Sequence, residues 1–159
     1  IESLEKRKVN YYFELAGEGD YGDKMQEFIV SRHLQEKVRL VGVLDKQGIG
    51  SFWRDKDICV NIADFEGRSR SIAEAMANGA VPVVTNTSGV NDDVCDGESG
   101  YIVPIEDYEA IADRIETLEQ NRILLSDKGT KAHMELKEKC SMDKHYQFWR
   151  ELIRYEMGE

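Results

Sequence analysis

The chain has 159 residues, 41% hydrophobic and 33% charged, and its 31 Asp and Glu against 21 Lys and Arg give a formal net charge of −10. This length predicts a single domain, residues 1–159, with a proper hydrophobic core, and the composition is ordinary for a soluble globular protein. The acidic balance argues against nucleic acid as a partner, because binding the phosphate backbone needs clustered Lys and Arg.

Strand-like and helix-like segments alternate along the chain, which predicts an α/β fold with a parallel sheet covered by helices on both faces. Residues 1–8 read as the end of a helix. The predicted strands are 9–16, 38–41, 58–63, 81–85 and 101–103. The predicted helices are 22–34, 46–54, 70–78, 90–95, 107–119 and 122–138, followed by a last helix whose N-cap is Ser141.

The cysteines and histidines indicate no metal site. Cys59, Cys95 and Cys140 fit no zinc spacing, so we expect reduced thiols in a cytoplasmic protein. The three histidines lack carboxylate or Cys partners at ligand spacing. No secretory signal is visible and no apolar run approaches the ~20 residues that span a bilayer. The chain starts at Ile1 without an initiator Met, and we expect it to be a piece of a longer protein.

Two acidic residues, Glu66 and Glu74, lie eight positions apart, where the predicted strand 58–63 gives way to the predicted helix 70–78. Ligands of open parallel sheets bind in the crevice outside the carboxyl ends of the strands, so we expect both acids at a ligand site. Carboxylates only accept hydrogen bonds, and two of them about one turn apart suit a ligand with several hydroxyl groups.

The same stretch carries a family resemblance. Glu66-x7-Glu74, followed by Ala75-Met76-Ala77-x-Gly79 and Val81-Pro82-Val83-Val84, resembles the donor-site signature of retaining GT-B glycosyltransferases of the family-four type. The similarity continues in residues 14–19, 38–42 and 96–103, in the right order, and so covers most of the chain. It implies a Rossmann-like domain, the C-terminal half of a GT-B fold, that lacks its first, central strand with the phosphate-binding Arg/Lys loop, and whose N-terminal acceptor domain is absent.

The resemblance also implies roles in binding a nucleotide-diphospho-sugar, which is a substrate and not a cofactor. Glu66, the catalytic candidate, would accept hydrogen bonds from hydroxyls of the transferred sugar, and Glu74 would bind the ribose diol. The base would lie near the end of the second strand. The residues implied at the diphosphate are Gly67, Arg68, Ser69 and Ser71, with Ser88 and Gly89 facing it, and those at the base are Leu40, Val41 and Gly42.

The implied reaction is transfer of the sugar, with retention, to a carbohydrate or lipid acceptor. It needs no metal and no side-chain nucleophile, since positioning and charge stabilisation suffice. The isolated chain should be inactive or nearly so. Peripheral association of the full-length enzyme with a membrane is left open. In the family the last helix crosses toward the other domain, so its apolar stripe would be interface or ordinary packing.

Two alternatives remain. Residues 17–22 match G-x-G-x-x-G after a predicted strand, which is typical of dinucleotide-binding oxidoreductases. However, Glu18 and Asp20 place negative charge where a pyrophosphate should lie, and no clear acid at a strand end follows about 20 residues later, Asp45 after Gly42 being only a loose candidate. The second alternative is a non-catalytic acidic α/β interaction module, for which Glu66→Ala and Glu74→Ala would leave all binding unchanged.

Overall fold

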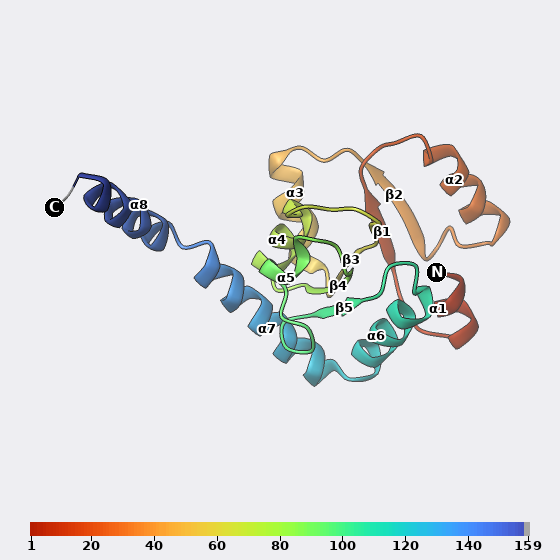
Figure 1. Ribbon diagram of the computed structural model, residues 1–159. Coiled ribbons are helices and arrows are strands. Elements are labelled where there is room, and N and C mark those ends of the chain that lie inside the picture. The colour runs from red at the N-terminus through yellow and green to blue at the C-terminus, as the bar shows by residue number, and fades with distance from the viewer. Residues whose placement is uncertain (158–159) are drawn as a thin grey trace. The chain divides into compact units, whose positions relative to one another are not determined.

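The computed structural model describes residues 1–157, and the side chains of residues 1–154. The chain forms two compact units, Ile1–Asp55 and Lys56–Glu159. Figure 1 labels their helices and strands in chain order. Every strand pairing is parallel, and the strands belong to two sheets, β1–β2 in the first unit and β3–β4–β5 in the second. The predicted α/β class is therefore correct.

The first unit is built around a two-stranded sheet. Its elements are α1 (Glu2–Arg7), β1 (Phe13–Ala16), α2 (Gly22–Ser31), β2 (Val38–Gly42), α3 (Lys46–Phe52) and the 3₁₀ turn η1 (Trp53–Asp55). Phe13 lies opposite Val38, and the register shifts between Leu15 and Ala16. Ile29, Leu34 and Val38 form the buried core of this unit.

Strand β1 is shorter than the predicted strand 9–16. Lys8 adopts a left-handed backbone with φ 58°, and the Val9 amide donates back to the Leu4 carbonyl at 3.1 Å. Val9 therefore closes helix α1 instead of extending β1. Pairing begins only at Phe13, whose amide donates to the Lys37 carbonyl at 2.8 Å.

The second unit has a three-stranded sheet covered on both faces. Its elements are β3 (Ile58–Asn61), α4 (Arg70–Ala77), β4 (Val81–Thr85), α5 (Val90–Asp93), β5 (Tyr101–Val103), α6 (Tyr108–Gln120), α7 (Arg122–Lys139) and α8 (Met142–Met157). All five residues of the middle strand β4 are buried. Val84 packs with apolar residues of α4, α5 and α7, whereas Val81 and Val83 pack with those of β5, α6 and the start of α7.

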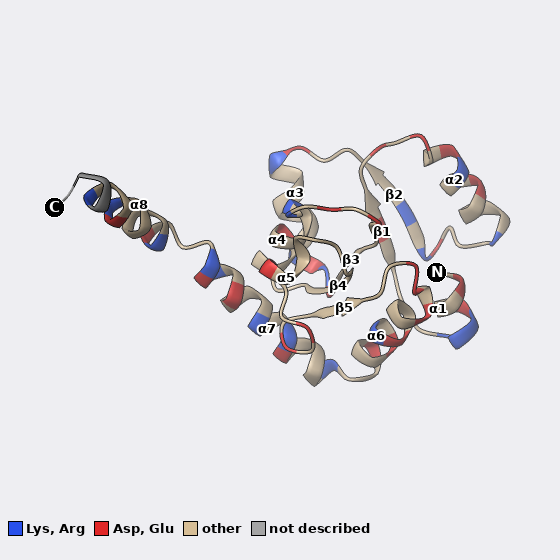
Figure 2. Cartoon of the chain, viewed as in Figure 1, with Lys and Arg blue, Asp and Glu red and all other residues tan. Residues whose placement is uncertain are grey.

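Glycine lets helix α7 approach the sheet closely. A Cβ on Gly129 would collide with the carbonyl oxygen of Gly79, in the turn before β4. Beyond α7, helix α8 begins at Met142, directly after the predicted N-cap Ser141, whose hydroxyl and carbonyl accept from the amides of Lys144 and His145. Charged residues of both signs alternate along α7 and α8 (Figure 2). Within the described residues no helix is both long and apolar enough to cross a bilayer.

The predicted gap in the sheet has a counterpart in the strand pairing. Among the described residues, β1 pairs with β2 alone and β3 pairs with β4 alone. A strand with a neighbour on one side presents unpaired backbone groups on the other. The strands β1 and β3 thus each have one open edge, as a fold that lacks a strand between them would leave.

Candidate functional site

The two acids selected from the sequence lie around the loop of residues 64–69, which we call the Glu66 loop and which joins β3 to α4. Glu66 is half-buried in this loop, and Glu74 is half-buried on α4. Within the part of the chain that the structure describes, neither carboxylate has a hydrogen-bond or ion-pair partner. Both are therefore available to hydroxyl groups of a ligand.

The start of α4 is not capped by its own N-cap side chain. Ser69 occupies the N-cap position and is 7% exposed, yet its hydroxyl makes no capping bond. It lies 2.9 Å from the Ser71 hydroxyl and accepts from Asn61 Nδ2 at 3.2 Å. The N–H groups of the first helical turn consequently keep their hydrogen-bonding capacity, and the helix dipole adds partial positive charge there. This end of α4 suits an anion.

Ser88 and Gly89 lie against the Glu66 loop, and their role at a diphosphate stays a prediction. The Ser88 hydroxyl donates to the Glu66 carbonyl at 3.0 Å. A Cβ on Gly89 would lie 2.5 Å from the carbonyl carbon of Gly67, so only glycine permits this approach. Around Gly67 itself there is space for a ligand, because a Cβ built there meets nothing within 4 Å.

Arg68 forms the strongest polar contact of the loop. Its Nε and Nη2 donate to the Asp93 carboxylate at 3.0 and 2.7 Å. The Asp93 side chain is 2% exposed, and its hydrogen bonds raise the pKa of the Arg68 guanidinium. Sequence reasoning missed both Asp93 and Asn61. For Asp93 a signal existed, because it shares helical spacing with the buried Val90 and Val94.

The residues expected at the base, Leu40, Val41 and Gly42, end strand β2 in the first unit. Leu40 lines a pocket of about 250 Å³ together with Met25 and residues 15–22. This pocket therefore contains the G-x-G-x-x-G loop, whose acidic residues colour the segment between β1 and α2 in Figure 2. The assignment of a base to Leu40–Gly42 stays a prediction.

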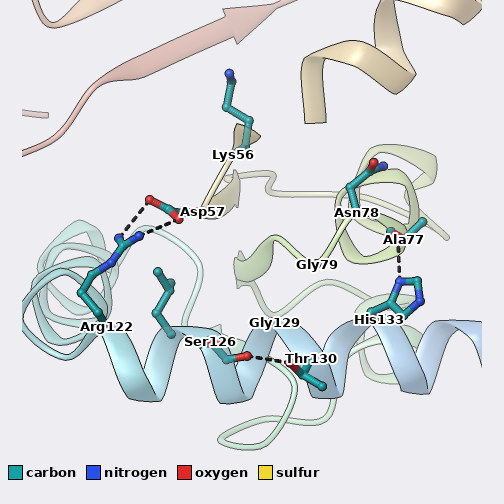
Figure 3. Close-up of a pocket in the computed structure, with 11 residues that line it drawn as sticks. Lys56, Asp57, Ala77, Asn78, Gly79, Arg122, Ser126, Gly129, Thr130 and His133 are labelled. Atoms are coloured by element: carbon teal, nitrogen blue, oxygen red, sulfur yellow. Dashed lines mark hydrogen bonds and ion pairs between the residues drawn. The ribbon is translucent and has the colours of Figure 1, made fainter. Parts of the chain in front are cut away.

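A larger pocket, of about 570 Å³, is lined by residues that precede β3 and β4, among them Asp57 and Gly79, and by residues of α7 (Figure 3). Its polar groups are largely paired with one another. Arg122 donates two hydrogen bonds to Asp57, at 2.9 and 3.0 Å, and His133 Nδ1 lies 2.7 Å from the Ala77 carbonyl oxygen. Such internal pairing makes this pocket the weaker candidate for a ligand.

Comparison with known proteins decides the family. A model of the family described as Glycosyl transferases group 1 matches residues 1–136. The chain belongs to this family. It is 28% identical over 153 residues to a poly(ribitol-phosphate) alpha-N-acetylglucosaminyltransferase of Staphylococcus aureus, covering 96% of this chain and 31% of that protein. It is also 31% identical over 104 residues to a phosphatidyl-myo-inositol mannosyltransferase of Mycobacterium leprae, covering 65% and 28%.

A solved structure agrees with this family membership. The crystal structure of S. aureus TarM in complex with fondaparinux, alpha-GlcNAc-glycerol and UDP matches with a TM-score of 0.80 and 26% identity, over 94% of this chain and 30% of TarM. The resemblance to the C-terminal domain of GT-B glycosyltransferases is thereby confirmed, and the oxidoreductase alternative is not favoured. This chain spans about a third of the length of these relatives.

Proposed function

We propose that this chain is the donor-binding domain of a retaining glycosyltransferase. The whole protein would transfer a sugar from a nucleotide-diphospho-sugar to a carbohydrate or lipid acceptor, with the acceptor held by an N-terminal domain. One observation supports the proposal: Glu66 and Glu74, both without internal partners among the described residues, lie four residues before and four residues after Arg70, the first residue of α4, whose start is uncapped.

Each part of such a donor has a chemical counterpart here. The sugar hydroxyls donate to Glu66 and the ribose diol donates to Glu74, and hydrogen bonds to a carboxylate are roughly twice as strong as neutral ones. The diphosphate lies over the N–H groups at the start of α4, which favour an anion by ~0.3–2 kcal/mol. Gly67 leaves space for the phosphates to approach the backbone.

The reaction follows from this placement. The bond between the anomeric carbon and the diphosphate oxygen breaks, the acceptor oxygen bonds to that carbon from the same face, and the acceptor proton passes to the leaving diphosphate. The domain positions the donor and stabilises the departing charge. We propose that the N–H groups of α4, and not a metal ion, supply this stabilisation, so EDTA should leave donor binding unchanged.

The relatives support the choice of probes. TarM was crystallised with UDP, and the names of two relatives refer to a poly(ribitol-phosphate) and to a phosphatidyl-inositol. A uridine nucleotide is therefore the first donor to try, and polyol-phosphate and lipid acceptors are the first acceptors. A lipid acceptor would bring the full-length enzyme to a membrane surface peripherally.

Thermal unfolding of the full-length protein tests the proposal. UDP-, GDP- and ADP-sugars and NAD are compared at the same concentration. A ligand at 100 times its Kd adds about 2.7 kcal/mol, which should raise the Tm of the transition that unfolds a domain of this size by about 5–10 °C. No shift with any nucleotide-sugar, or a shift with NAD alone, would contradict the proposal.

A matched pair of variants locates the effect. Glu74→Gln should lower the affinity for the stabilising donor about tenfold or more, because a charged hydrogen-bond acceptor is lost. Glu119→Gln makes the same change on α6, which packs on the other face of the sheet, and should leave the affinity unchanged. Equal affinities of the wild type and Glu74→Gln would remove Glu74 from the site.

A further inference from the structure

The segment of residues 88–93 holds the Glu66 loop at three successive residues. Ser88 donates to the carbonyl of Glu66, Gly89 packs on the backbone of Gly67, and Asp93 accepts from the guanidinium of Arg68. Asn61 and Thr85 fix the two ends of the loop: Asn61 Nδ2 donates to the Ser69 hydroxyl, and Thr85 exchanges hydrogen bonds with the backbone of Ala63.

Asp93 is the buried charged side chain among those that hold the loop. Its side chain is 2% exposed, whereas that of Arg68 is 58% exposed. Loss of the partner of a buried carboxylate leaves an uncompensated charge in the interior and strongly destabilises the folded protein. The ion pair must therefore persist for α5 to remain packed. The edge of the guanidinium formed by Nε and Nη2 is thus committed to Asp93 and holds the loop two residues after Glu66.

The contact with Asp93 restricts a role for Arg68 as a direct ligand of the diphosphate, because only the N–H groups not bound to Asp93 could reach a phosphate without breaking it. Turning the guanidinium edge to a phosphate would leave Asp93 buried and unpaired. Nη2 also lies 3.9 Å from the Sγ of Cys140, at the end of α7, which adds a contact on the side of Asp93. The geometry favours an arginine that orients its loop.

We propose that Asp93, acting through Arg68, is a positioning residue for Glu66. This inference rests on the proposed function, since it assumes that Glu66 binds the sugar of the donor. Asp93 keeps the Glu66 loop in one conformation, so that the Glu66 carboxylate meets the sugar without first ordering the loop. Preorganisation of this kind raises affinity by lowering the entropy lost on binding.

Hydrogen exchange of the full-length protein without ligand tests the holding of the loop. In Asp93→Asn, amides of residues 64–71 should exchange about tenfold faster than in the wild type, while those of α6 stay unchanged. Asp92→Asn is the matched control, because Asp92 is the adjacent, exposed acid and the variant makes the same charge change. Unchanged exchange in the loop of Asp93→Asn would overturn the proposal.

A double-mutant cycle tests the link to Glu66. The probe is whichever of UDP-N-acetylglucosamine, GDP-mannose and ADP-glucose stabilises the wild type most, titrated well below the Tm of each variant. Asp93→Asn should weaken binding about tenfold in the wild type but less than threefold in Glu66→Gln, because residues that act as a unit are non-additive. Equal losses in both backgrounds would show that Asp93 is merely structural.

A second variant covers the case in which Asp93→Asn does not fold. Arg68→Lys keeps the positive charge that faces Asp93 but loses the bidentate contact. Its loop exchange and its Glu66-dependent loss of affinity should both lie between those of the wild type and Asp93→Asn. If it behaves as the wild type in both measurements, the proposal fails. If no donor binds the wild type, the proposed function fails with it, whereas donor binding with additive losses contradicts only the positioning role.

Discussion

The close approach of Gly89 to the Glu66 loop gives a sharp test of the site's construction. In Gly89→Ala the new Cβ would lie 2.5 Å from the Gly67 carbonyl carbon and 2.9 Å from the Arg68 amide nitrogen. These are backbone atoms, so no side chain can rotate away to make room. The loop or the segment of residues 88–93 must move.

The magnitude follows from this geometry. Insertion of a methyl group into a tightly packed place costs about 1–3 kcal/mol. Replacing glycine with alanine also lowers the entropy of the unfolded chain, which offsets about 0.4–1 kcal/mol. Because the blocking atoms are backbone, we expect a net loss of about 1–2 kcal/mol for Gly89→Ala. For a chain of this length, that lowers the Tm by about 2–8 °C.

Gly67→Ala is the matched control, on the other side of the same contact. A Cβ on Gly67 meets nothing within 4 Å, so this variant should unfold at or slightly above the wild-type temperature. It should nevertheless weaken donor binding, because its methyl group occupies the space proposed for the phosphates. Thermal unfolding and donor titration of both variants measure the two effects. Equal Tm values for Gly89→Ala and Gly67→Ala would refute the reasoning.

Three further predictions concern the second unit, each checked by denaturant unfolding. Gly129→Ala should cost about 1–3 kcal/mol, since its Cβ would meet the Gly79 carbonyl oxygen. Burial raises the pKa of the Cys59 thiol from 9.0 to about 12, so its contribution to stability is complete below pH 9 and is lost as the pH rises toward 12, at up to ~1.4 kcal/mol per pH unit. Cys59→Ala should flatten this alkaline loss, and an identical pH dependence would contradict the assignment. Arg122→Ala should cost less than about 1 kcal/mol, because its ion pair with Asp57 is more than half exposed; a larger loss would show a stronger role in the pocket of Figure 3.

The sequence was sufficient where a single local pattern decides the structure. The continuous apolar run of residues 81–85 predicts a buried strand, and β4 has those bounds with every residue buried. The stripe of residues 107–119 predicts α6 to within one residue at each end. In the same way, the patterns of residues 58–63 and 70–78 place the junction between β3 and α4, with Glu66 in the connecting loop and Glu74 on the helix.

Local patterns failed where a distant partner or a cap decides the structure. The predicted helix 22–34 ends at Ser31 because His33 takes a left-handed backbone with φ 55° and the Leu34 amide closes back on the Ile29 carbonyl. The pairing of Arg68 with Asp93 joins residues 25 positions apart. No periodicity in the sequence predicts such a contact, although an acid on an apolar helix face does indicate that a partner is needed.

Amide hydrogen exchange of the full-length protein, with and without the stabilising nucleotide-sugar, tests the central claim most directly. We predict that exchange slows at residues 67–72, where the N–H groups at the start of α4 would meet the diphosphate, and that Glu74→Gln reduces this protection. Protection at residues 77–79 and 122–133, with none at 67–72, would instead place the ligand in the pocket of Figure 3 and contradict the account.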